Sequence, residues 1–148
     1  MVGQAHRRCV ERLSALRIRI DTPQRHLESQ QPLVCTETHV PQPDFMVLRG
    51  ALGDYNDLPY AADAFCVLEV ADSSNERDAG EKRNAYAKAG IVQYVIINLR
   101  NRTAEVYGLN DVTDGEYPPP TVIPETGSIP LRIGDAEVFA VPLAELLA

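Results

Sequence analysis

The stretch at residues 63–90 reads DAFCVLEVADSSNERDAGEKRNAYAKAG, and it decides the fold. Its first part, residues 64–70, is an apolar run with the length of a β-strand, interrupted only by Glu69. An ionised glutamate in such a strand costs several kcal/mol unless it meets a metal ion, a cation or a polar cavity. Glu69 is therefore the first candidate site residue.

A helix follows this strand. Ser73 and Glu76 form a capping-box pattern at its start, and Gly90 is a typical helix stop. At 100° per residue, one arc of the helix is expected to pack inward, and Lys82 lies near its middle. That arc comprises Asn75, Asp78, Ala79, Lys82, Ala85, Tyr86 and Ala89. A lysine in this position requires carboxylates nearby, and Glu69 ends the strand just before.

The next apolar run, residues 92–99, is rich in β-branched residues and predicts a second strand. Strand, helix and strand in this order predict a βαβ unit with two parallel strands and a right-handed crossover. The helix should then cover one face of a sheet.

Weaker patterns predict the remaining elements. We expect helices at residues 4–18 and 142–147, strands at 33–38, 44–48, 103–107 and 137–141, and loops at 21–31, 50–63 and 108–134. The strand at 103–107 should form a hairpin with the strand at 92–99. The predicted class is α/β.

Length and composition fit one soluble domain, residues 1–148. No segment resembles a transmembrane helix, and arginines interrupt any signal-peptide pattern near the start. The three cysteines, Cys9, Cys35 and Cys66, are odd in number and lack C-x-x-C spacing, which indicates a reducing, cytoplasmic location. No membrane partner is expected.

The charge is uneven along the chain. The net charge of −7 argues against unspecific nucleic-acid binding by the whole surface. Residues 1–28 contain six arginines and three acidic residues, a net charge of +3, whereas the other 8 basic and 18 acidic residues give −10. Phosphate contacts would come from the N-terminal part or across a dimer; alternatively, these arginines are only solvated helix charges.

A second acid lies near Glu69 if the strands at 44–48 and 64–70 are antiparallel neighbours. Asp44 would then stand opposite Glu69 on the same face of the sheet. These two carboxylates and the Val70 carbonyl could bind Mg²⁺, for which Mn²⁺ can substitute, while Lys82 acts on the attacking water or on the phosphorane. The alternative without catalysis is that Lys82 only forms a helix ion pair with Asp78.

An ordered series of residues carries a resemblance to a known family. It comprises P43-D44, E69-V70, D72-S73-S74, D78-x-x-x-K82, Y86-A87-x-A89-G90-I91-x-x-Y94 and I96-I97-N98-L99. This series, between about residues 31 and 107, resembles the Uma-type restriction endonuclease family of the PD-(D/E)XK nuclease superfamily.

The resemblance implies a restriction-endonuclease-like core: a mixed β-sheet with an antiparallel meander, one βαβ crossover and flanking helices. It implies a Mg²⁺-dependent endonuclease that cuts DNA as a homodimer, with Asp44, Glu69 and Lys82 as the catalytic residues. The lysine of the usual E-x-K spacing would fall on Ala71, so the lysine has moved to the helix. Glu11 is the candidate for an additional acid. Family members usually carry further N-terminal residues, so a shortened N-terminus is one expectation.

Two other functions remain open at the level of sequence. The chain could be a non-cleaving nucleic-acid-binding or regulatory module that keeps the nuclease fold, or a small structural partner in a larger complex. A histidine at the start of the first helix, His6, also resembles the family, but it is better explained as a partly exposed helix residue. The other histidines lack metal-ligand spacing.

Overall fold

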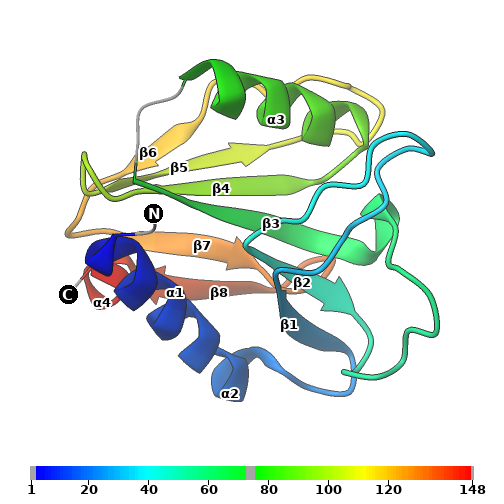
Figure 1. The fold of residues 1–148 in the computed structure, drawn as a ribbon, viewed down its shortest axis with the longest axis horizontal. Coiled ribbons are helices and arrows are strands. Elements are labelled where there is room, and N and C mark those ends of the chain that lie inside the picture. The colour runs from blue at the N-terminus through cyan, green and yellow to red at the C-terminus, as the bar shows by residue number, and fades with distance from the viewer. Residues whose placement is uncertain (1–2, 73–75, 148) are drawn as a thin grey trace.

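The computed structural model describes residues 3–72 and 76–147, and its strands form one six-stranded sheet and one two-stranded sheet (Figure 1). The helices are α1 (Gln4–Ala15), α2 (Arg17–Ile20), α3 (Glu76–Lys88) and α4 (Leu143–Leu147), with a short 3-10 turn at Ala61–Asp63. The strands are β1 (Arg25–Ser29), β2 (Phe45–Arg49), β3 (Ala64–Ala71), β4 (Gln93–Asn98), β5 (Thr103–Gly108), β6 (Thr121–Ile123), β7 (Ser128–Arg132) and β8 (Val138–Pro142).

The large sheet has the order β1-β2-β3-β4-β5-β6. Only β3 and β4 are parallel, and α3 connects them; all other neighbours are antiparallel. The predicted βαβ unit and the hairpin of β4 with β5 are therefore confirmed. Strands with apolar side chains on both faces, such as β3 and β4, need cover on both sides.

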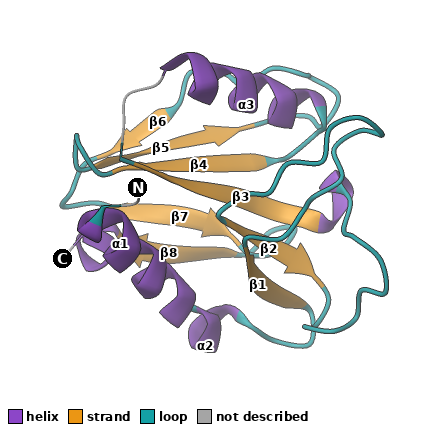
Figure 2. Cartoon of the chain, viewed as in Figure 1, coloured by secondary structure: helices purple, strands orange, loops and turns teal. Residues whose placement is uncertain are grey.

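Two cores provide this cover, one on each face of the sheet (Figures 1 and 2). On one face, α3 packs through Tyr86 and Ala87 onto Val67, Tyr94 and neighbouring side chains. On the other face lie α1, α4 and the β7–β8 ribbon. Side chains of β3 alternate between the two cores, so Glu69, in phase with Val67, belongs to the α3 side.

Some predicted elements were wrong. Residues 21–31 were predicted as a loop but contain β1, and residues 108–134 contain β6 and β7. Residues 33–38 form only isolated bridges, and Pro142 closes β8 instead of starting α4. The missed strands are short, polar or interrupted by proline, and neighbouring strands hold them in place.

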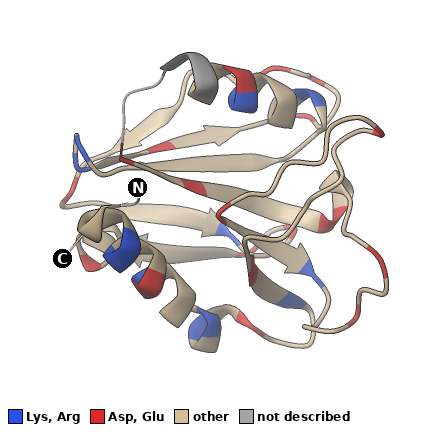
Figure 3. Cartoon of the chain, viewed as in Figure 1, with Lys and Arg blue, Asp and Glu red and all other residues tan. Residues whose placement is uncertain are grey.

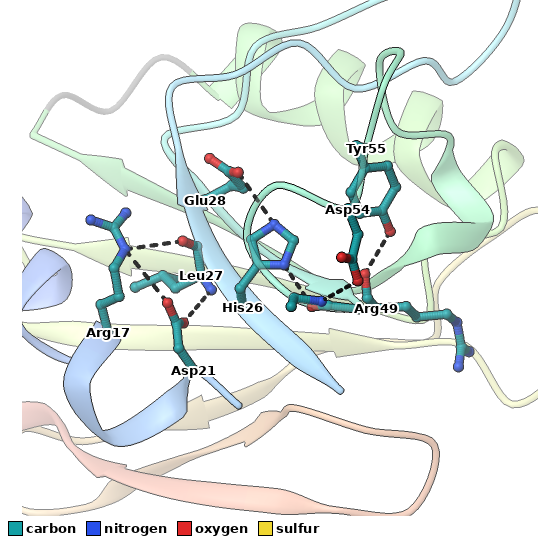
Figure 4. Close-up of polar contacts among 10 residues, drawn as sticks. Arg17, Asp21, His26, Leu27, Glu28, Arg49, Asp54 and Tyr55 are labelled. Atoms are coloured by element: carbon teal, nitrogen blue, oxygen red, sulfur yellow. Dashed lines mark hydrogen bonds and ion pairs between the residues drawn. The ribbon is translucent and has the colours of Figure 1, made fainter. Parts of the chain in front are cut away.

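Polar contacts hold β1 at the edge of the large sheet (Figure 4). The Leu27 N–H donates to Asp21 Oδ1 at 2.7 Å, and Arg17 Nε donates to the Leu27 carbonyl at 3.2 Å. On the other face, the buried His26 ring lies with Nδ1 2.7 Å from the Gly50 carbonyl and Nε2 3.2 Å from Glu28. These contacts use the polar residues that made the segment look like a loop.

The C-terminal end of α3 confirms the predicted stop. Gly90 has φ +82°, its N–H donates to Ala87, and the Ile91 N–H donates to Tyr86. This is the Schellman arrangement, which glycine adopts without strain. The predicted cap at Ser73 lies outside the described residues. In residues 3–72 and 76–147, none of the helices has the length and apolar character that a membrane span requires.

Candidate active site

Asp44 and Glu69 meet where β2 begins and β3 nears its end. The pair Phe45↔Leu68 sets the antiparallel register, and one step further Asp44 stands opposite Glu69. The Asp44 N–H lies 3.4 Å from Glu69 Oε2, and the Val70 N–H donates to Asp44 Oδ2 at 2.8 Å. The structure thus brings the two predicted acids together on one face of the sheet.

The Glu69 carboxyl group is buried, with 9% of the residue exposed. Tyr86 donates its hydroxyl to Glu69 Oε1 at 3.2 Å, from the buried face of α3. Burial, followed by the negative charge of Asp44, raises the pKa of Glu69 to about 7, and the charge of Lys82 acts in the opposite direction. A cation beside the two acids would relieve both unfavourable effects.

Lys82 is placed differently from the prediction. The buried face of α3 is centred on Tyr86 and Ala87, each 1% exposed, whereas Lys82 is exposed. Arg83 occupies part of the inner face instead, because its guanidinium group lies over the Tyr107 ring and donates to the Tyr107 hydroxyl at 3.1 Å. The inward face of this helix was therefore predicted around the wrong residue: Lys82 is exposed, and the buried face is centred on Tyr86 and Ala87.

Lys82 nevertheless has an electrostatic effect on Glu69. It lies one turn before Tyr86 on α3, so both side chains leave the same side of the helix. Its positive charge lowers the pKa of Glu69 and thus favours the carboxylate. Lys82 lies at the solvent-facing rim of the acidic pair. The side chain of Asp78, its predicted neighbour, lies outside the described residues.

The Val70 carbonyl has a distinct environment. Because Val70 donates its N–H toward Asp44, its carbonyl points to the same side of β3. Continuing the register two residues beyond its last pair, Phe45↔Leu68, would place Pro43 opposite Val70, and a proline has no N–H to donate. Pro43 thus cannot donate a hydrogen bond to the Val70 carbonyl, which follows directly after Glu69 in the strand.

Among the residues of α1, Cys9 experiences the charge of Asp44. Glu11 is exposed on α1, and its carboxylate lies 3.6 Å from Arg7. Cys9 is fully buried, and its thiol pKa is raised to about 11, mainly by burial, with a smaller contribution from Asp44. His6, one turn earlier, has a buried Nδ1 without a hydrogen-bond partner among the described residues. The structure does not bring Glu11 into the acidic pair.

Tyr86 is the site residue that sequence reasoning missed, because its inward position suggested only a core aromatic. Its position four residues after Lys82 could have indicated it. Its ring packs on Tyr94 at 5.0 Å between centroids, so the hydroxyl is fixed toward Glu69.

The arrangement offers oxygen ligands of the kind that Mg²⁺ prefers: two carboxylates and one carbonyl. Within the described parts of the chain, no group of three or more His, Cys, Asp or Glu side chains could hold a metal ion by itself. Mg²⁺ needs no such cage, because it retains waters and binds substrate phosphates. Asp44, Glu69 and Val70 therefore fit a magnesium ion shared with a phosphate.

Comparisons with known proteins bear on the family and the fold. The family model described as "Uma2: Putative restriction endonuclease" matches residues 1–137. A crystal structure of a putative nuclease belonging to DUF820 from Anabaena variabilis ATCC 29413 is similar to this chain, with a TM-score of 0.75 and 12% identity. That similarity covers 99% of this chain and 82% of the other. No curated protein shows significant similarity. The predicted nuclease-like fold is thus confirmed.

Proposed function

Because the chain belongs to the Uma2 family of putative restriction endonucleases, we propose that it hydrolyses phosphodiester bonds in DNA, with Mg²⁺ bound at Asp44 and Glu69. The observation that carries the proposal is the proximity of these two acids at the end of the β2–β3 pairing: Glu69 Oε2 lies 3.4 Å from the Asp44 backbone nitrogen, and the Asp44 charge contributes to the raised pKa of Glu69. Two negative groups at one buried point cost free energy, and a divalent cation would offset that cost.

Each residue has a distinct role in the proposal. Asp44, Glu69 and the Val70 carbonyl hold the metal ion, and Mn²⁺ is expected to replace Mg²⁺. When bound, the ion activates a water molecule and neutralises charge on the phosphate. Lys82, at the rim, stabilises the developing charge on the phosphate oxygens. Tyr86 orients the Glu69 carboxylate through its hydroxyl.

The setting of the reaction belongs to the same proposal. A symmetric homodimer would present two sites to the two DNA strands, which sedimentation of the purified chain can test. All three cysteines are free in the structure, in keeping with a cytoplasmic location.

Plasmid cleavage tests the proposal. The wild-type chain should nick or cut supercoiled plasmid in Mg²⁺ and in Mn²⁺, and EDTA should stop it. Glu69→Gln should lower the rate by a factor on the order of 10² or more, because it removes a charged ligand without changing the shape of the side chain.

The matched control is Glu105→Gln. Glu105 lies in the same row of the sheet as Glu69, two strands away through Ile96. This variant loses the same charge and should cleave like the wild type. Equal rates in wild type and Glu69→Gln would refute the assignment. Titration calorimetry distinguishes the proposed nuclease from a non-cleaving module with the same fold. If the chain binds neither Mg²⁺ nor Mn²⁺ at concentrations up to millimolar, the non-cleaving module is favoured.

A further inference from the structure

Three arginines line one small cavity near the end of β3, on the face of the sheet that α1 and α4 cover. The cavity has a volume of about 60 Å³ and is lined by Arg8 and Arg12 of α1, Arg102 of the β4–β5 turn, and Ala5, Leu99 and Leu147. Segments about ninety residues apart in the sequence are thus brought together. Figure 3 shows basic residues on α1 and at the β4–β5 turn, on the side where β3 ends.

The cavity is positively charged although the molecule carries a net charge of −7. No acidic residue is among its lining side chains. Arg102 Nε bonds Glu125, whereas Arg8 and Arg12 form no ion pair with any described residue. The three guanidinium groups thus have one carboxylate between them, and the excess positive charge would be stabilised by a bound anion.

Neighbouring arginines are neutralised locally. Arg7 lies 3.6 Å from Glu11, and Arg19 lies 3.8 Å from Glu145. The unbalanced charge is thus confined to the cavity and is not a general property of α1.

The cavity adjoins the strand ends that carry the acids. Leu99, in its lining, donates its N–H to the Ala71 carbonyl at 2.9 Å, and Ala71 is two residues after Glu69. The start of α1 reaches the same end of β3, since a Cβ on Gly3 would lie 3.0 Å from Asp72 Oδ2. An extended polyanion crossing this end of the sheet could therefore contact the acids and the cavity together.

We propose that the cavity formed by Arg8, Arg12 and Arg102 binds one backbone phosphate of the nucleic acid, near the phosphate that is cleaved. This inference rests on the proposed function. Guanidinium groups donate paired hydrogen bonds to phosphate oxygens, and Arg is suited to this recognition. The volume of about 60 Å³ is sufficient for a group of phosphate size. Such a contact positions the strand without reading its sequence.

Salt-dependent binding tests the cavity without requiring cleavage. The affinity of a short duplex oligonucleotide is measured by fluorescence anisotropy over a range of NaCl concentrations, in the Glu69→Gln background. Arg12→Gln and Arg102→Gln should each weaken binding, and each should reduce the slope of log K against log salt by up to about 0.9, the value for one phosphate.

The double variant gives the sharper result. Because both arginines contact the same phosphate, Arg12→Gln combined with Arg102→Gln should reduce the slope by about 0.9 in total and not by twice that amount. Arg7→Gln removes the same charge from α1 outside the cavity and should leave the slope unchanged. Urea unfolding of each variant verifies that the fold is retained.

The outcomes separate this inference from the proposed function. Oligonucleotide binding with the expected slopes, but no cleavage by the wild type, would support the phosphate site and overturn the nuclease activity. Cleavage by the wild type with unchanged slopes in both arginine variants would overturn the phosphate site alone. Arginine-dependent binding of inorganic phosphate without any change in oligonucleotide binding would also overturn it, and would indicate a site for small anions.

Discussion

At the scale of single residues, Glu69 links the site to the stability of the fold. Its folded-state pKa of about 7 lies above the ordinary value of 4.5, so the folded protein retains this proton to higher pH than the unfolded chain. The group therefore carries no penalty below about pH 4.5, and the penalty grows until the pH passes about 7.

Glu69→Gln should remove this penalty. In metal-free buffer, the free energy of unfolding of the variant should exceed that of the wild type increasingly between pH 4.5 and 7, up to roughly 3 kcal/mol, and the difference should then level off. Urea unfolding at several pH values measures it, with Glu105→Gln as the control for a lost surface charge. Parallel pH profiles of wild type and Glu69→Gln would contradict the buried, proton-binding state of Glu69.

Tyr86→Phe tests the hydroxyl that faces Glu69. The loss of a buried hydrogen bond should reduce stability by about 1–3 kcal/mol. It should also raise the pH at which cleavage reaches half its maximum, because the Glu69 carboxylate loses a donor. Tyr117→Phe is the control: it removes a buried hydroxyl that donates to the Ile91 carbonyl at 2.7 Å, and should reduce stability without moving the pH profile.

At the scale of elements, the free edge of β1 is protected by α2 and the turn that follows it. Asp21 and Arg17 occupy the N–H and the carbonyl of Leu27, which would otherwise be open to another strand. An exposed strand edge is a template for pairing with a second chain.

Asp21→Ala should therefore destabilise the fold by about 1–2 kcal/mol and increase aggregation on mild heating. Asp21→Asn keeps an acceptor oxygen and should restore most of the stability. Thermal unfolding and light scattering measure the two effects. Equal behaviour of the alanine and asparagine variants would show that Asp21 does not protect the edge.

The elements also show where sequence reasoning succeeds. The β3–α3–β4 unit was predicted because its apolar runs and helix stop are local signals. The facing of Asp44 and Glu69 was predicted separately, on the assumption that β2 and β3 are antiparallel neighbours, which the structure confirms. β1 was missed because its stabilising partners, Asp21 and Arg17, lie outside the strand. The orientation of α3 was misjudged because the helix is rich in alanine, and a contact of Arg83 with Tyr107 decides its inner face.

At the scale of the whole molecule, the proposed Mg²⁺ site would couple metal binding to folding. If Mg²⁺ binds only the folded state, it stabilises the protein by about 2.7 kcal/mol at 100 times its dissociation constant. The melting temperature of the wild type should therefore rise with Mg²⁺, and more at pH 8 than at pH 6, since binding requires an ionised Glu69. The melting temperature of Glu69→Gln should stay nearly constant. A similar rise in both proteins would place the ion elsewhere.

The proline at position 43 affects both the stability of the β-sheet and the proposed metal site. An alanine at position 43 would supply the amide hydrogen that proline lacks. The pairing of β2 with β3 could then gain one more backbone hydrogen bond. That hydrogen bond would engage the oxygen of Val70 as an ordinary sheet acceptor, so this oxygen would no longer be available to a metal ion beside the acids. The lack of an amide hydrogen at Pro43 thus keeps this oxygen open for the proposed site.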